Sequence, residues 1–171
     1  MPTLASLLVA ELDAEMKGTR RALERVPEGQ SDWKPHEKSM PLGYLAGLVA
    51  TMPGWIVSMV RDDSLDLAAP GDNSTPHTPS PAELLELFDA RVAAGRAALA
   101  GASDDRLLNT RWRLMMGDRV LTDQTRYEAI RGGALNHLYH HRAQLTTYLR
   151  LNEKPVPSLY GPSADEPFPG G

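Results

Sequence analysis

The sequence of 171 residues contains no cysteine, no dense run of Lys or Arg and no long uninterrupted apolar stretch. The missing cysteine excludes disulfides, thiolate nucleophiles and Cys-ligated zinc. With a formal net charge of -4 and no basic run to follow a phosphate backbone, nucleic acid is not an expected partner. Any thiol in the chemistry of this protein would have to arrive with another molecule.

The first twenty residues resemble neither a leader peptide nor a membrane span. They lack a basic start, and Glu11, Asp13 and Glu15 interrupt their apolar stretch. No apolar run approaches the roughly 20 residues that cross a bilayer. We therefore expect a cytoplasmic protein without a membrane partner.

The composition is typical of one globular domain. Hydrophobic residues make up 42% of the chain and charged residues 23%, which suits a packed core. The length matches a single domain of about 100 to 200 residues. The domain is expected to span residues 1–171, with the Pro- and Gly-rich segment 153–171 as an extended tail.

Apolar residues that recur every three or four positions predict four helices. Their expected ranges are 3–26, 40–61, 81–99 and 123–152. Ser39 is expected to cap the second helix and Ser80 the third, while Pro53 predicts a kink. Prolines and glycines between 69 and 81 predict a loop. The simplest packing of four such helices is an antiparallel bundle.

A short hairpin is predicted before the last helix. Residues alternate between 110 and 121, with Trp112, Leu114 and Met116 on one side and Gly117-Asp118 as the turn. The expected fold class is therefore all-α, an antiparallel four-helix bundle with a short β-hairpin insertion. Gly132-Gly133 weakens the last helical pattern and would allow a neighbouring helix to approach closely.

Two histidines one turn apart are the most informative feature of the last predicted helix. His137 and His141 lie about 40° apart around the helix axis, so both imidazoles can face one ion, whereas His140 lies off that line. Catalytic zinc generally has three protein ligands and a water. The spacing alone therefore favours histidines that are hydrogen-bonded to Gln, Tyr or backbone partners over a metal site.

Three segments together resemble a known family. They are DWKPHEKSMPLGYLA (Asp32–Ala46), MPGW (Met52–Trp55) and LNHLYHHRAQLTTYLRLNEKPVPSLYGPSADE (Leu135–Glu166). With the order of helices and hairpin, they resemble the DinB/YfiT-like family of metal-dependent four-helix-bundle proteins, which is similar to thiol-dependent transferases and a maleylpyruvate isomerase. The resemblance implies a homodimer and a divalent metal, often nickel or zinc, held by one histidine of the second helix and an HxxxH pair of the last.

The sequence departs from the family pattern at one metal ligand. His137 and His141 match the pair, but the position four residues before MPGW, where the family has its third histidine, is Leu48. Leucine has no lone pair, and its methyl groups would fill the volume that an ion and its water need. Losing a residue that only hydrogen-bonds to a metal ligand already lowers metal affinity roughly 10- to 100-fold. Losing a ligand itself should lower metal affinity at least as much. His36 precedes the helix and is not expected to replace the ligand.

Two functions remain for this pattern. The first is a degenerate or weakly metal-binding protein that binds a small molecule in an apolar pocket beside two hydrogen-bonded imidazoles. The alternative is a divalent-metal-dependent transferase or hydrolase, in which nickel or zinc on His137 and His141 activates water or an external thiol. No side chain stands out as a catalytic residue, so the sequence does not decide whether the protein is an enzyme.

Several other conspicuous side chains are expected to be structural. Trp33, Trp55 and Trp112 should pack in the core or at its rim, because large aromatic side chains dominate burial. Arg142 and the tail carboxylates of Asp165 and Glu166 should fasten the tail rather than bind a charged substrate.

Overall fold

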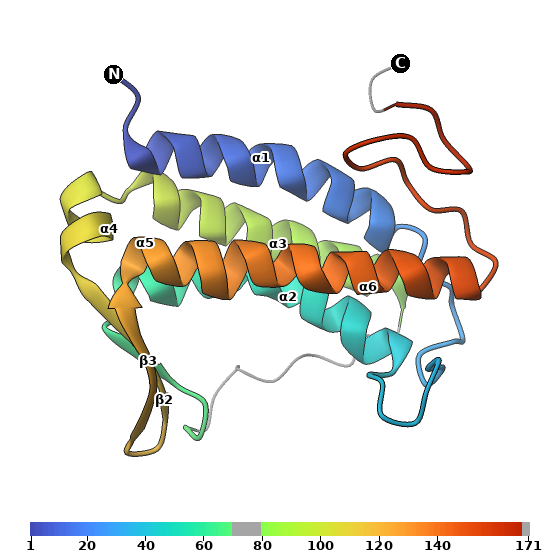
Figure 1. Ribbon diagram of the computed structural model, residues 1–171, viewed down its shortest axis with the longest axis horizontal. Coiled ribbons are helices and arrows are strands. Elements are labelled where there is room, and N and C mark those ends of the chain that lie inside the picture. The colour runs from blue at the N-terminus through green and yellow to red at the C-terminus, as the bar shows by residue number, and fades with distance from the viewer. Residues whose placement is uncertain (70–79, 169–171) are drawn as a thin grey trace.

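The computed structural model describes residues 1–69 and 80–168 of the chain. Long helices lie side by side, and a small sheet projects from one end of them (Figure 1). In chain order the elements are α1 (Leu4–Leu23), α2 (Leu42–Arg61), β1 (Ser64–Asp66), α3 (Pro81–Ala100), α4 (Asp104–Asn109), β2 (Arg111–Met116), β3 (Arg119–Thr125), α5 (Arg126–Glu128), the π-helix η1 (Ala129–Asn136) and α6 (His137–Leu151). The described chain is mostly helical, with a three-stranded sheet where only a hairpin was predicted.

Local capping chemistry explains where α3 begins but not where α2 begins. The Ser80 hydroxyl accepts a hydrogen bond from the backbone N–H of Glu83, as predicted. In contrast, α2 begins after Pro41 without a side-chain cap, so the predicted cap at Ser39 is wrong. The backbone N–H of Ser39 instead closes a turn onto the carbonyl of His36 at 3.0 Å.

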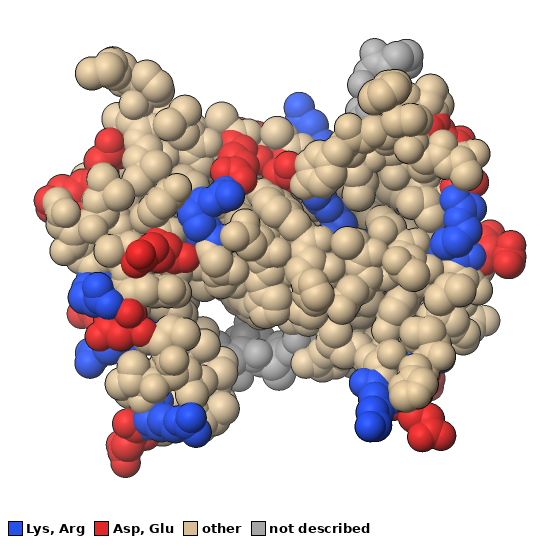
Figure 2. Space-filling model, viewed as in Figure 1, with Lys and Arg blue, Asp and Glu red and all other residues tan. Residues whose placement is uncertain are grey.

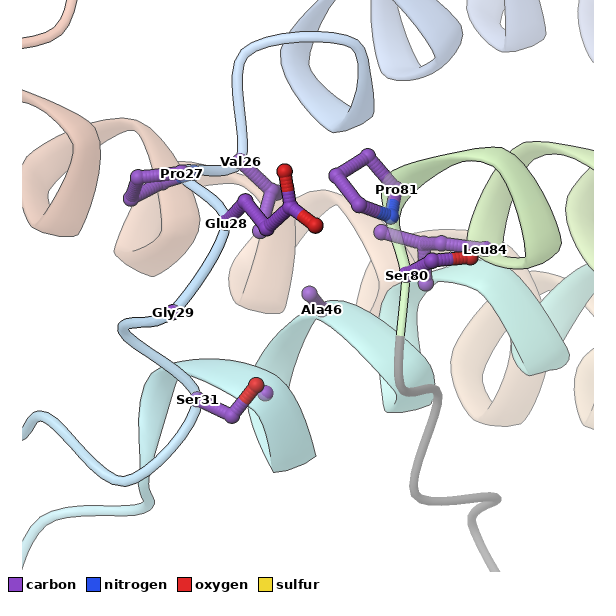
Figure 3. Close-up of a pocket in the computed structure, with 10 residues that line it drawn as sticks. Val26, Pro27, Glu28, Gly29, Ser31, Ala46, Ser80, Pro81 and Leu84 are labelled. Carbon is purple, nitrogen blue, oxygen red and sulfur yellow. The ribbon is translucent and has the colours of Figure 1, made fainter.

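The helices α2 and α3 run parallel, unlike the antiparallel neighbours expected from the sequence. At their starts, Ala46 of α2 and Pro81 of α3 lie across a small cavity from each other (Figure 3). At their ends, Val60 and Ala97 line one common surface depression. A 20-residue helix is about 30 Å long, and the connection 62–80 is long enough to return over that distance. Most of the predicted loop in this connection lies outside the described residues.

The helix α2 is the apolar centre of the fold. Its length and composition alone would allow it to cross a membrane, which corrects the expectation that no stretch is apolar enough. However, 72% of that stretch is buried inside the protein, where a core helix gives the same signal. Leu45, Val49 and Ile56 are completely buried, and the helix continues through Pro53.

The strand β1 and a bulge distinguish the sheet from the predicted hairpin. β2 and β3 pair antiparallel around a turn in which Gly117 has a φ of +57°, a conformation that favours glycine. β1 adds a third strand parallel to β2, and its three residues are too few to show a periodic pattern. Trp112 and Leu114 share the interior side as predicted, but a register shift after Leu114 leaves Met116 exposed.

The predicted last helix is divided into three segments. Thr125 begins α5 in a capping box with Glu128, and η1 then inserts eight residues of π-helix before α6. A Cβ on Gly133 would lie 3.1 Å from Met59 Cε, so the end of a methionine side chain of α2 packs into the space that the glycine leaves. A Cβ on Gly132 would meet nothing within 4 Å. π-helical turns are often found at functional sites, so η1 is a second reason, besides the histidine pair, to expect a site next to His137.

The described part of the tail lies against the C-terminal end of α1 (Figure 1). The carboxylate of Glu166 accepts a hydrogen bond from the backbone N–H of Ser158 at 2.9 Å and pairs with Arg21 of α1 and with Arg25, which follows α1. Asp165 pairs with Arg150 of α6. These pairs confirm that the two tail carboxylates fasten the tail.

Glu166→Gln is expected to remove a pH dependence from the stability of the protein. The Ser158 N–H and the Arg25 guanidinium hold the pKa of Glu166 well below its ordinary value of 4.5, at about 2. Because the folded pKa is the lower one, the stabilisation is complete above about pH 4.5 and is lost as the pH falls toward 2. Melting temperatures from pH 7 to 2 should show the parent losing its advantage over the variant in that window. Glu37→Gln is the exposed control, and a parent–variant difference that stays constant with pH would contradict the assignment.

Candidate functional site

A cavity of about 420 Å³ opens between the sheet and the helices. Figure 2 shows the surface hollowed between the hairpin and the helices, with few charged side chains around the hollow. Most of its wall is apolar and comes from α2, the sheet and the turn after β1: Trp55, Met59, Leu65, Leu67, Trp112 and Leu114. Pockets for small molecules usually have volumes of about 300 to 1,000 Å³, so this cavity is large enough for one.

The register of the sheet builds one wall of this cavity. Leu65, Leu114 and Thr122 stand in one row across the three strands, and Trp112 stands opposite Gln124 in the next row. Residues that pair directly across strands share a face of the sheet, and all five line the cavity. The unpredicted strand β1 is therefore part of the site.

The π-helix η1 contributes another part of the wall and leads to His137. Gly132 and Gly133 line the cavity, and a Cβ on Gly132 would meet nothing within 4 Å, so the backbone leaves room for a larger side chain there. His137 follows at the first position of α6 and is exposed. Its ring lies against Trp55, with the two ring centroids 5.8 Å apart. His137 is therefore the polar group at the edge of an apolar cavity.

A chain of hydrogen bonds runs from His137 away from the cavity. His141 Nδ1 and the Gln144 amide oxygen are 2.8 Å apart, and the Nε2 atoms of His141 and His137 are 2.9 Å apart. A neutral imidazole has one donor and one acceptor nitrogen. Since an amide oxygen only accepts, His141 Nδ1 donates to Gln144, and His141 Nε2 accepts from His137. The Gln144 amide nitrogen then donates to His140 Nε2 at 3.1 Å, so each of the three bonds has one donor.

Burial favours the neutral form of His141 that this chain requires. The side chain is buried while His137 and His140 are exposed. Desolvation lowers the pKa of His141 from its ordinary value, the nearby His137 and His140 lower it further, and the bond to Gln144 opposes the shift. Gln144, three residues after His141, was not singled out from the sequence, although that spacing places the two on one face of a helix.

Two contacts between α2 and α6 show where Leu48 lies. Trp55 of α2 contacts His137, and the Tyr148 hydroxyl of α6 donates to the carbonyl of Met40 just before α2 at 3.2 Å. The helices are therefore antiparallel, and Leu48 lies at about the level of His141. Leu48 is seven residues before Trp55, so both project from nearly the same side of α2, and Leu48 is 8% exposed.

The donor set does not fit the three-histidine centre that the family resemblance implies. The Nε2 atoms of His137 and His141 converge. Gln144 hydrogen-bonds to the other ring nitrogen of His141, as residues around a metal site do to a histidine ligand. Within residues 1–69 and 80–168, however, no three His, Cys, Asp or Glu side chains are placed to hold an ion. His36 lies exposed in the connector before α2, where its Nδ1 accepts from the N–H of Lys38 at 3.2 Å. Two imidazoles are present where three are expected.

Two other cavities are weaker candidates. The one drawn in Figure 3 has a volume of about 20 Å³, which is room for roughly one water. Another, of about 480 Å³, lies between α1, α6 and the tail. Its buried cation Arg142 already pairs with Glu15 at 2.7 Å, lies over the rings of Tyr139 and Tyr160, and donates a hydrogen bond to the Tyr160 hydroxyl. Arg142 therefore helps to fasten the tail through Tyr160, rather than through the tail carboxylates.

Comparisons with known proteins agree with this fold. A crystal structure of a DinB-like protein from Bacillus cereus superposes with a TM-score of 0.71 at 21% identity, covering 92% of this chain and 98% of that one. A DinB-like protein from Bacillus subtilis gives 0.65 at 16% identity, covering 88% and 95%. No curated protein matches the sequence. The family model of the DinB superfamily matches residues 11–145, a range that includes Leu48, the hairpin and both histidines of the pair, and the chain therefore belongs to the DinB superfamily.

Proposed function

We propose that this protein binds a small, largely apolar molecule in the cavity beside His137 and His141, and that it binds divalent metal only weakly. The cavity carries the proposal, because it joins a mostly apolar wall to a single imidazole at its edge. The hydrogen bond from His137 already uses the lone pair of His141 Nε2. Leu48 supplies no third donor at the same level of α2.

The alternative function is a metal-dependent transfer or hydrolysis. Nickel or zinc on His137 and His141 would lower the pKa of a bound water or an external thiol, which would then act as the nucleophile. The convergence of the two Nε2 atoms and the outer hydrogen bond to Gln144 favour this function. The missing third donor counts against it, and we place it second.

Four further properties belong to the same proposal. The packing of α1, α2, α3 and the η1–α6 stretch supports the class of four-helix bundles, with α2 and α3 parallel. A net charge of -4 supports the absence of a nucleic-acid partner. The homodimer and the cytoplasmic location stay predictions, and sedimentation of the purified chain checks the first.

Gly132→Phe is expected to abolish most binding of an apolar probe. A Cβ at this position meets nothing within 4 Å, so a phenyl ring can enter the cavity without a clash with the backbone. Removing about 60 Å² of apolar contact lowers affinity roughly tenfold at about 25 cal/mol per Å². The measurement is a titration with N-phenyl-1-naphthylamine, whose fluorescence rises in an apolar site, in the presence of EDTA so that metal takes no part.

Gly161→Phe is the matched control for that titration. Gly161 also faces open space, has an ordinary φ and does not line the cavity. This variant should bind the probe as the parent does. The proposal is wrong if the parent does not bind the probe, or if the two phenylalanine variants lose affinity equally.

A further inference from the structure

The indole N–H of Trp112 is a buried donor without a partner. Trp112 is 2% exposed and lines the cavity. Among the buried side-chain nitrogen and oxygen atoms of residues 1–69 and 80–168, Nε1 of Trp112 is the one that makes no hydrogen bond. An unpaired buried donor is costly and is rare in folded proteins. The nitrogen has almost no accessible surface, so an acceptor in the cavity reaches it only after a small shift of the indole or of a neighbouring side chain. The hydrogen bond then removes the cost of the unpaired donor.

The neighbours of Trp112 limit the charge of such a molecule. Gln124 stands directly opposite Trp112 across β2 and β3, and its side chain lines the cavity without a hydrogen bond to the described residues. The side-chain amide N–H of Gln124 is therefore a second donor near the indole N–H. The described cavity wall contains no Lys, Arg, Asp or Glu. A carboxylate or ammonium placed there would lose its hydration without gaining an opposite charge, which is strongly unfavourable.

We propose that the natural ligand is an uncharged molecule with a ring or branched hydrocarbon body and one carbonyl-type oxygen, which accepts a hydrogen bond from Trp112 Nε1–H. This inference rests on the proposed binding function and specifies its ligand. The hydrocarbon body packs against Trp55, Met59 and Leu114. The oxygen lies on the sheet side of the cavity, away from His137 at the mouth.

Two probes of the same shape test the hydrogen bond. The probes are 2-acetylnaphthalene, which has a ketone oxygen, and 2-isopropenylnaphthalene, in which a CH₂ group replaces that oxygen. Both are titrated into the parent and into Trp112→Phe, and the ratio of their affinities is compared, so that differences in their hydration cancel. The ketone should lose roughly five- to tenfold relative to the alkene in Trp112→Phe, because the variant lacks the N–H donor. The alkene loses only apolar contact with the larger indole, so its affinity should fall by less than that of the ketone, and its continued binding shows that the variant keeps its cavity.

The parent protein provides a second measurement that does not depend on the variant. The three tryptophans give three indole N–H signals in an NMR spectrum, and Trp33→Phe and Trp55→Phe assign the Trp112 signal by elimination. The ketone should move that signal to lower field and the alkene should not. An unchanged affinity ratio, or an indole signal that responds equally to both probes, would overturn the role of Trp112. Failure of the parent to bind either probe would overturn the binding function itself.

Discussion

Leu48→His is expected to raise the affinity of the protein for Ni²⁺ and Zn²⁺ by at least roughly 10- to 100-fold. Leu48 lies at the level of His141 on the side of α2 from which Trp55 reaches His137. An imidazole at 48 would add a third nitrogen to two whose Nε2 atoms are already 2.9 Å apart. Three protein donors with a position left for water form the usual catalytic zinc site. A competition titration against a chromophoric chelator, with protein that carries no histidine tag, measures the change.

Leu48→Asn separates coordination from a general effect of polarity. Asparagine is close to leucine in shape and introduces a polar group at this position, as histidine does. Its amide is a poor ligand for these ions. It should bind metal as the parent does. Adding His141→Ala to Leu48→His should remove the gain. If the parent already binds metal as tightly as Leu48→His, the idea of an incomplete centre fails and the metal-dependent alternative becomes the better function.

The histidine pair and its missing partner could be predicted from the sequence, but the cavity could not. His137 and His141 are found by their spacing within one helix, and position 48 is singled out by the family resemblance, which places a histidine four residues before MPGW. Both are local features of the sequence. The cavity depends on pairing between β1 and β2, which joins segments almost fifty residues apart. It also depends on η1, because the π-helix interrupts a pattern that looks like a continuous helix. The tryptophan at 112 was correctly expected to be buried, but its unpaired N–H depends on what surrounds it.

The helix boundaries show the same division between local and long-range information. Ser80, Pro81 and Glu83 act within one turn, so the start of α3 follows from the sequence. The relative direction of α2 and α3 depends on the path of a long connection, and its composition is compatible with either direction. Ser39 was a reasonable cap by residue type, but the turn onto His36 places its backbone outside the helix.

Gly95→Ala is expected to destabilise the protein even though alanine favours helix. A Cβ at Gly95 would lie 2.4 Å from the carbonyl oxygen of Pro53 and 3.3 Å from its carbonyl carbon. The obstacle is backbone, so α2 and α3 would have to move apart. Overpacking of this kind costs about 1 to 3 kcal/mol, which exceeds the gain of roughly 1 kcal/mol from replacing glycine in a helix. Urea unfolding should give a lower free energy of unfolding, and the melting temperature should fall by several degrees.

Gly132→Ala is the matched control, because the same substitution should raise the free energy of unfolding there. Its Cβ would meet nothing within 4 Å, so the gain in helix propensity of roughly 0.5 to 1 kcal/mol remains. Pro53 is two residues before Trp55, so the contact at Gly95 also fixes the side chain that lies against His137. Gly95→Ala should therefore weaken probe binding as well as stability. If it is as stable as the parent and binds the probe equally well, the close approach of α2 and α3 does not hold Trp55 in place, and the cavity wall must be positioned by the sheet and η1.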